Sequence, residues 1–285
     1  MIDMRRTLVL VLMVTASAVS AATQTSAPAP SDKADALSAA ARKGDVAAVK
    51  KLLDEGVDVN TKFRYNATAL SFAADRGHVE VVKLLIERGA DVNAKDTFYG
   101  ATPLTWAVGP AMGRTPQHPA VVGLLLQHGA QGKEQALMAA MSDAATVKVI
   151  LDSGGISSGS LSDALEMATK AKRSEIIALL EHAGAKPHVE MKLDAADLAR
   201  YVGTYRGALP GQAQAATLAV TAADGRLTTT LGGQRLTLIA RDKTTFGVAE
   251  QPGTRVTFRL EQDKATSITL TAMGNSINFT RAEEK

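Results

Sequence analysis

The pattern of hydrophobic and polar positions changes its period near residue 190. Before that point, short apolar stripes recur at helical spacing, as at Val79, Val82 and Leu85. After it, apolar residues alternate with polar ones, as at Val256 and Phe258, which is the period of a half-buried strand. The pattern therefore predicts a multidomain α + β protein with short helices first and an antiparallel sheet afterwards.

The helical part repeats. Gly44–Asn60 and Gly77–Asn93 align without gaps, so that Gly77 follows Gly44 by the same interval as Gly89 follows Gly56. One short helix with a single apolar stripe cannot bury that stripe alone, but stacking neighbouring repeats buries it. Gly56, Gly89 and Gly129 follow the apolar stripes, and glycine suits the left-handed residue just past a helix end. The repeat therefore predicts a solenoid of stacked helix pairs.

A recognisable motif begins the third repeat at Thr102–Ala107, which reads TPLTWA. It matches the T-P-L-H-x-A motif of ankyrin repeats except at Thr105, which replaces His, and the string GADVNAK starting at Gly89 is typical of the same family. The chain therefore resembles ankyrin-repeat proteins over residues 34–186. The resemblance implies about five repeats, each with a turn and two short helices.

The later repeats depart from this pattern. Gly129 lies farther along the chain from Leu104 than Gly89 lies from Leu70, so the third repeat carries an insertion within 108–119. The last two units, 134–155 and 162–185, lack the turn and the TPL segment. We expect short loops there, because terminal repeats are commonly atypical.

Seven alternating runs lie between residues 218 and 279, after YVGTYRG at Tyr201–Gly207. Asp194 is the expected N-cap of a short helix before them. Turn signals separate the runs at Asp224-Gly225, Gly232-Gly233, Asp242-Lys243, Pro252-Gly253 and Gly274-Asn275. About eight antiparallel strands with one apolar face predict a closed or nearly closed β-barrel.

Segments such as LARYVGTYR and RVTFRLEQDKATSITLT look like a small β-barrel domain of unknown function. That domain often follows serine β-lactamase-like or peptidase domains in exported bacterial proteins. The resemblance covers residues 194–283 and implies a fold and a compartment rather than an activity. The S-x-x-K motif of the serine β-lactamase-like domains is absent, because no serine here has a lysine at the third position after it.

The N-terminus has the organisation of a signal peptide. Arg5 and Arg6 precede an apolar run at Leu8–Val14, and small residues lead to an expected cleavage site after Ala21. A membrane anchor is the alternative, but the run is shorter than the roughly 18 residues of a membrane span. We therefore expect a periplasmic or secreted bacterial protein with no stable membrane span after cleavage. The sequence holds no cysteine, which excludes disulfides, thiol catalysis and thiolate-bound zinc.

Candidate chemistry is sparse in this sequence. The string GISSG at 155–159 fits G-x-S-x-G, but a nucleophile elbow needs a preceding strand, and a helical pattern precedes it here. No two of the five histidines are spaced i, i+4, and no H-E-x-x-H motif occurs. The net charge is only +3, without a basic run. We therefore expect no catalytic residues, no metal, no cofactor and no nucleic-acid partner.

The resemblance to ankyrin repeats implies a binding face made of hairpin tips and the exposed side of the first helix of each repeat. Aromatic residues and arginine most often anchor protein interfaces. Two readings stay open for the aromatics, including Trp106: contact with a partner, or packing within the repeats. The candidate partner-binding residues are Arg42, Lys43, Arg64, Tyr65, Asp75, Arg76, Phe98 and Tyr99.

The expected division is a signal peptide at 1–21, a flexible leader at 22–33, an ankyrin-repeat domain at 34–186, a linker at 187–193 and a β-barrel domain at 194–283. The expected function is that of an exported scaffold that binds a protein partner and has no catalysis of its own. One alternative is a small apolar ligand inside the barrel, although eight strands leave an interior only just wide enough for side chains. Another is an accessory module of a hydrolase or other enzyme.

Overall fold

The computed structural model describes residues 32–109, 118–208, 215–231, 233–272 and 275–282. The expected signal peptide, most of the leader and most of the 108–119 insertion lie outside the described residues. The chain divides into two compact units, which we describe separately. The repeat unit comprises the described residues up to Ser157 together with Ser174–Gly184, and the barrel unit comprises Ser158–Arg173 and the described residues from Ala185 onward.

Five helix pairs follow one another along the chain, as the repeat pattern predicts. The pairs are α2 (Asp32–Lys43) with α3 (Val46–Asp54), α4 (Ala69–Asp75) with α5 (Val79–Glu87), α6 (Pro103–Val108) with α7 (Pro119–Gln127), α8 (Lys133–Ala139) with α9 (Ala144–Asp152), and α10 (Ser158–Lys170) with α11 (Ser174–His182). Two boundaries differ from expectation. Helix α2 begins within the expected leader, and α10 begins ahead of the expected fifth unit.

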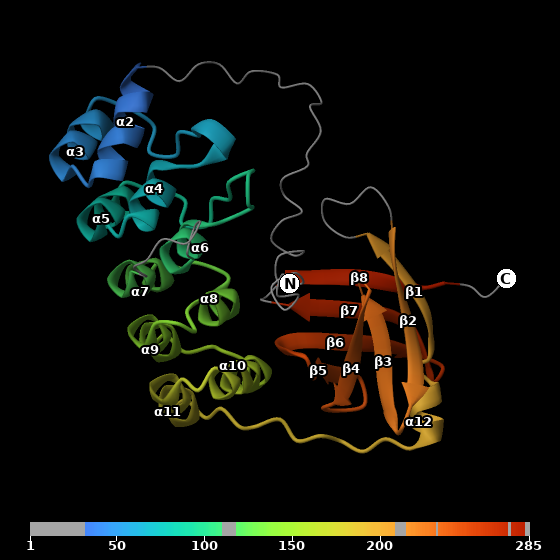
Figure 1. Cartoon of the computed structure of the whole chain (residues 1–285). Coiled ribbons are helices and arrows are strands. Elements are labelled where there is room, and N and C mark those ends of the chain that lie inside the picture. Colours follow the sequence, from blue (N-terminus) through green and yellow to red (C-terminus); the bar gives the residue numbers. More distant parts are fainter. Residues whose placement is uncertain (1–31, 110–117, 209–214, 232, 273–274, 283–285) are drawn as a thin grey trace, which may run out of the picture. The chain divides into compact units, whose positions relative to one another are not determined.

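The helices of the repeat unit form two layers (Figure 1). The first helices α2, α4, α6 and α8 pack in one layer, and the second helices α3, α5, α7, α9 and α11 pack in the other. Leu37, Leu70, Leu104 and Leu137 recur once in each repeat, and each is at most 1% exposed. The hydrophobic core therefore repeats with the sequence, because each first helix buries the same position against its neighbours.

Asparagine side chains link the first repeat to the second and the second to the third. Asn60 accepts a hydrogen bond from the backbone N–H of Asp91 at 2.8 Å and donates one to the carbonyl oxygen of Gly89 at 3.1 Å. Asn93 makes the same pair of bonds to Gln131 and Gly129 one repeat later. The asparagine that ends GVDVN at residue 60 and GADVN at residue 93 thus joins one repeat to the next. The glycine that Asn60 contacts, Gly89, has the expected positive φ of 85°.

Two histidines pack on glycines of the preceding repeat. The Nε2 of His78 donates to the carbonyl oxygen of Arg42 at 3.0 Å, and a Cβ added to Gly44 would lie 2.6 Å from the His78 ring. His118 lies in the same way over Gly77. His78 therefore has a packing role between repeats. His118, expected within an insertion, is instead the N-cap residue of α7.

Eight antiparallel strands form a closed barrel in chain order, with β1 paired to β8, which confirms the predicted architecture. The strands are β1 (Gly203–Ala208), β2 (Ala215–Ala223), β3 (Arg226–Leu231), β4 (Gln234–Ala240), β5 (Thr245–Val248), β6 (Gln251–Glu261), β7 (Lys264–Ala272) and β8 (Asn275–Arg281). Short helix α12 (Ala195–Ala199) precedes them, and its N-cap is Asp194, as predicted.

The turns between strands follow the sequence signals at two of the described places. Asp224 and Gly225 both have positive φ between β2 and β3, and Asp242 and Lys243 lie in the connection between β4 and β5. The prediction of a turn at Pro252-Gly253 is wrong, because these two residues lie inside β6. The pairing of β5 with β6 shifts its register after Gly247, so the strand accommodates Gly253 at a φ of +77°.

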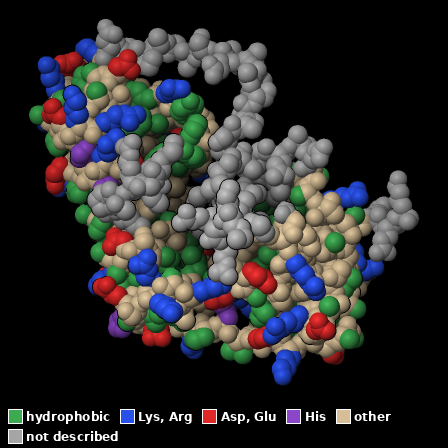
Figure 2. All heavy atoms as spheres, viewed as in Figure 1, with side chains coloured by type: hydrophobic (Ala, Val, Ile, Leu, Met, Phe, Trp, Pro, Cys, Tyr) green, Lys and Arg blue, Asp and Glu red, His purple; other side chains and the backbone are tan. Residues whose placement is uncertain are grey.

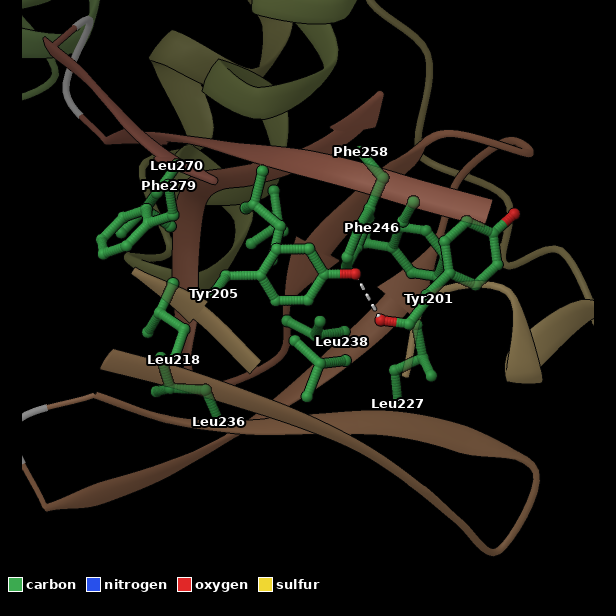
Figure 3. Close-up of a cluster of buried hydrophobic side chains, with 14 of the residues drawn as sticks. Tyr201, Tyr205, Leu218, Leu227, Leu236, Leu238, Phe246, Phe258, Leu270 and Phe279 are labelled. Carbon is green, nitrogen blue, oxygen red and sulfur yellow. Dashed lines mark hydrogen bonds between the residues drawn. The ribbon is translucent and has the colours of Figure 1, made fainter. Parts of the chain in front are cut away.

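Aromatic rings fill the barrel interior (Figure 3). Tyr201, Tyr205 and Phe258 are each at most 2% exposed, and the Tyr201 and Phe258 ring centroids lie 5.0 Å apart. The Tyr205 hydroxyl donates to the carbonyl oxygen of Tyr201 at 2.7 Å, the dashed line in Figure 3. Within the described residues, the interior is a packed core, as the expected strand number implies.

Candidate functional site

The tips that precede α4 and α6, at residues 61–67 and 94–101, are adjacent and joined by their backbones. The N–H of Thr97 donates to the carbonyl oxygen of Tyr65 at 2.7 Å. Each tip is also closed on itself, by Phe63 N–H to Ala67 and by Asp96 N–H to Ala101. The two tips therefore form one continuous strip of surface.

Aromatic rings line this strip. The ring centroids of Tyr65 and Phe98 lie 4.8 Å apart, those of Phe98 and Tyr99 lie 4.4 Å apart, and those of Tyr99 and Trp106 lie 5.8 Å apart. We call Tyr65, Phe98, Tyr99 and Trp106 the aromatic row. The first three are 46%, 42% and 47% exposed, whereas Trp106 is partly buried. The rings of the aromatic row pack on one another, as one reading of the sequence holds, and three of them still face solvent, so contact with a partner stays a prediction.

Asp96 holds the second tip in place. Its side chain is buried and accepts three hydrogen bonds, from the N–H of Phe98 at 3.0 Å, the N–H of Tyr99 at 2.7 Å and the indole Nε1 of Trp106 at 2.9 Å. A carboxylate bound by three donors fixes the backbone that carries both aromatic side chains. The sequence analysis did not identify Asp96. An aspartate in a loop can accept a hydrogen bond from the backbone N–H two residues later, which is an Asx turn, so its position in the tip was a usable signal.

A second aromatic contact lies one repeat earlier, between the first tip and α4. Phe72 has the same repeat position as Trp106, and its ring centroid lies 5.7 Å from that of Phe63. The Arg42 guanidinium lies 3.5 Å above the Phe72 ring, and the Arg64 guanidinium lies 4.7 Å from the ring of Tyr65. Cations stacked on aromatic faces are common at recognition surfaces.

Two of the predicted residues lie at the end of α4. Asp75 and Arg76 form an ion pair at 3.3 Å. Burial lowers the pKa of Arg42, and the like charge of Arg76 lowers it further, while Asp75 acts in the opposite direction. Lys43 is exposed at the end of α2.

The predicted residues therefore gather in two groups. Arg64, Tyr65, Phe98 and Tyr99 are joined along the tips, and Arg42 lies with Asp75 and Arg76 beyond Phe72. On the face drawn in Figure 2, hydrophobic side chains lie among Lys and Arg side chains over the repeat unit.

The barrel unit contains a buried group of charges that the sequence did not indicate. Asp163 on α10 is bound by Arg241 and Arg255 from the barrel and by the Nε2 of His188, the last at 2.9 Å. Glu166, one turn later on α10, accepts from Arg241 at 2.6 Å. Burial by itself would raise the pKa of Asp163, but the hydrogen bonds from His188 and Arg255 and the charge of Arg241 lower it to about 2.

Asp163, Glu166 and His188 are close enough to share a metal ion. Both carboxylate oxygens of Asp163 already accept hydrogen bonds, however, and two of the donors are guanidinium groups. A cation at this position would meet the positive charges of Arg241 and Arg255. The group is therefore an ion-pair network that binds α10 to the barrel.

The G-x-S-x-G string runs from the loop after α9 into the first turn of α10, because Ser158 and Gly159 already belong to that helix. Helix α9 ends at Asp152, Gly154 and Gly155 both have positive φ, and α10 begins at Ser158. No strand precedes Ser157 in this described segment, so the geometry of a nucleophile elbow is not present. This agrees with the interpretation of Ser157 as part of an inter-helix loop.

Comparison with known families identifies the helical part. Residues 11–96 and 37–133 match the family model of ankyrin repeats (3 copies). No curated protein matches the chain. None of the helices in the described part of the chain is long and apolar enough to cross a membrane. The resemblance of the barrel to the domain that follows serine β-lactamase-like domains stays a prediction. With its regular sequence repeat, its stacked helix pairs and this match, the helical part is an ankyrin-repeat region, and a closed eight-stranded antiparallel barrel follows it.

Proposed function

We propose that this protein is an exported scaffold that binds a protein partner through the aromatic row, without catalysis of its own. Ankyrin repeats suggest a protein-interaction scaffold. The observation that carries the proposal is the contact of three half-exposed rings, Tyr65, Phe98 and Tyr99, across two consecutive repeats. Large exposed aromatics at one place are typical of interface anchors.

The tip is also ordered before it meets a partner. The three hydrogen bonds to Asp96 and the backbone bond from Thr97 to Tyr65 hold the rings in place. A surface that is already ordered loses less conformational entropy when it binds. This order favours the tips, rather than the ends of α2 and α4 alone, as the binding surface.

Capture of a partner tests the proposal. The full chain, the double variant Phe98→Ala/Tyr99→Ala and the control Val46→Ala would each be immobilised and exposed to extract of the source cells. Val46 is a matched control because it is an exposed apolar residue of the same unit, on α3. We expect one protein to be retained by the full chain and the control and lost from the double variant. Equal retention by all three would reject the aromatic row as the site.

The export part of the proposal rests on the sequence of residues 1–21. We expect the mature protein in the periplasmic or secreted fraction, with Ala22 as its first residue. Cell fractionation and N-terminal sequencing measure both. An intact Met1 in a cytoplasmic fraction would reject export and leave the binding surface unaffected.

The non-catalytic part rests on the lack of an S-x-x-K motif in the sequence and on the loop position of Ser157. A screen of the purified chain against esterase, peptidase and β-lactam substrates tests it. We expect no turnover above that of the Ser157→Ala variant. Turnover that this substitution abolishes would instead favour the enzyme alternative.

A further inference from the structure

The exposed charges on the two tips share one sign. Lys62 and Arg64 lie on the first tip and Lys95 lies on the second, and all three are exposed. Lys62 and Lys95 have the same position in consecutive repeats, as do Tyr65 and Phe98. Cations and aromatic rings therefore recur together from one tip to the next.

The one acidic residue of the two tips is not accessible to direct contact with a ligand. Asp96 is 4% exposed, and its carboxylate accepts hydrogen bonds from two backbone N–H groups and the Trp106 indole. An arriving ligand meets the lysines and Arg64 rather than this carboxylate. The balance of accessible charge on the strip is thus positive although the whole chain carries only +3.

The neighbouring helix ends add positive charge. Arg42 lies near the like charge of Arg76, and partial desolvation together with that charge lowers the pKa of its guanidinium group. Asp75 offsets only part of the repulsion that Arg42 meets, because its carboxylate also forms an ion pair with Arg76 at 3.3 Å. An anionic group placed near Arg42 would relieve the repulsion between the two guanidinium groups.

We propose that the tip strip binds an acidic peptide segment that carries aromatic or large aliphatic side chains. The inference rests on the proposed function and names its partner class. The carboxylates of the peptide pair with Lys62, Arg64 and Lys95, and its apolar side chains pack on Tyr65, Phe98 and Tyr99. Complementary charge fixes the position and speeds association, while the apolar contacts supply most of the affinity.

A nucleic acid is the competing polyanion, because aromatic rings beside cations also suit stacked bases. Two exposed carboxylates, Asp58 and Asp91, lie in the loops just before the tips. A phosphate backbone carries a charge at every nucleotide and would meet them, whereas a peptide can place its acids selectively. The surface therefore favours the peptide.

Selection from random peptides tests the inference. The purified full chain would be used to select from a phage library of random dodecapeptides, and the selected peptides would be synthesised with a fluorescent label. Fluorescence anisotropy would give their dissociation constants with the full chain and with the variants Lys62→Glu, Lys95→Glu and Phe98→Ala. Lys83→Glu is the matched control, since Lys83 is an exposed lysine of the same unit on α5.

We expect the selected peptides to be enriched in Asp and Glu together with aromatic residues or leucine. Each lysine reversal should weaken binding about threefold or more, and Phe98→Ala should weaken it about tenfold. Lys83→Glu should leave the dissociation constant unchanged, and the losses should shrink in high salt. Thermal unfolding by circular dichroism checks that each variant is folded.

The other outcomes separate the two proposals. Peptides that need Phe98 but carry no acidic residues would overturn the acidic partner and leave the proposed function standing. Failure to select any peptide, or peptides that bind independently of Phe98, would overturn both. A single-stranded oligonucleotide that binds through Lys62, Lys95 and Phe98, while acidic peptides do not, would identify nucleic acid as the ligand and overturn the inference.

Discussion

The ring of Phe98 lies 4.8 Å from the ring of Tyr65, which has the same position in the preceding repeat. In the sequence each residue is an isolated aromatic in a loop. In the structure the two rings pack against each other. We predict that the pair couples its repeats. A double-mutant cycle of Tyr65→Ala and Phe98→Ala should give a coupling free energy of unfolding of about 0.5–1 kcal/mol, because half-exposed rings bury only part of their area. Chemical denaturation measures it, and a coupling of zero would show that the rings do not support one another.

We predict that the Asp96 carboxylate stabilises the second tip and the position of the Trp106 ring. Replacing Asp96 by Ala leaves the N–H of Phe98, the N–H of Tyr99 and the Trp106 indole without their acceptor, so we expect a loss of about 2 kcal/mol in the free energy of unfolding. Trp106 is the only tryptophan, so its fluorescence reports on the site directly. The emission maximum should move in Asp96→Ala and stay in place in Asp91→Ala, since Asp91 accepts a backbone bond from Asn93 rather than from the indole. The same spectrum in both variants would contradict this role.

Two glycines with similar backbones should respond differently to alanine. Gly44 and Gly56 have φ of +77° and +87°, so alanine at either position costs about 1–2 kcal/mol in strain. Only at Gly44 would the new methyl group meet another side chain, the ring of His78. We therefore expect Gly44→Ala to destabilise the protein by at least about 1 kcal/mol more than Gly56→Ala.

The additional free energy of unfolding that Gly44→Ala loses relative to Gly56→Ala should depend on His78. In the background of His78→Ala, the free energies of unfolding lost by Gly44→Ala and Gly56→Ala should become nearly equal. Equal losses already in the presence of His78 would show that the ring moves aside without cost.

The Asp163 network predicts a defined acid dependence. Its pKa is about 2 in the folded protein against 3.8 ordinarily, so its ionised form stabilises the fold above about pH 4. That contribution is lost as the pH falls from about 4 to about 2. Asp163→Asn should cost about 3 kcal/mol at pH 7, because it removes the buried negative charge shared by Arg241 and Arg255 and leaves Arg241 paired with Glu166 alone.

A matched ion pair on the surface provides the control. Asp152 pairs with Lys148 at 2.6 Å, but both side chains are more than half exposed. Asp152→Asn should therefore change the free energy of unfolding by less than about 0.5 kcal/mol. Denaturation at pH 7 and at pH 3 measures both variants, and similar losses for the two would mean that the Asp163 network contributes little.

Tyr205 predicts an alkaline dependence. Burial raises the pKa of its hydroxyl to about 12, so the protonated form stabilises the barrel unit fully below about pH 10, and this is lost as the pH rises to about 12. Tyr205→Phe removes the bond to Tyr201, costs about 1 kcal/mol at pH 8, and weakens the alkaline loss. Denaturation at pH 8 and pH 11 measures both effects, with the exposed Tyr99→Phe as control at pH 8. An unchanged alkaline loss in Tyr205→Phe would assign that loss to other groups.

Much of the fold could be read from short-range patterns. The repeat period and the glycines after helix ends are local properties of the sequence, and Gly56, Gly89 and Gly129 all have the expected positive φ. The alternation after residue 200 likewise led to eight strands. The local signal was ambiguous at Pro252-Gly253, because these residues are as compatible with an irregular strand as with a turn. The turn predicted there is wrong.

The candidate site was predicted only in part. Tyr65, Phe98 and Tyr99 were identified because they fall on the hairpin tips of the repeats and aromatic residues often anchor protein interfaces. Asp96 was not, since its three donors come from its own tip and from the next helix, and nothing in the spacing indicates that they converge.

The sequence by itself determined the architecture of each part, because periodicity reports which face of an element is buried. Only the tertiary structure decided what lies opposite each buried face. Asp163 meets Arg241 from the connection after β4 and Arg255 from β6, and His78 meets Gly44 of the repeat before it. Such contacts depend on how separate elements are brought together, and residue order along one element carries no information about them.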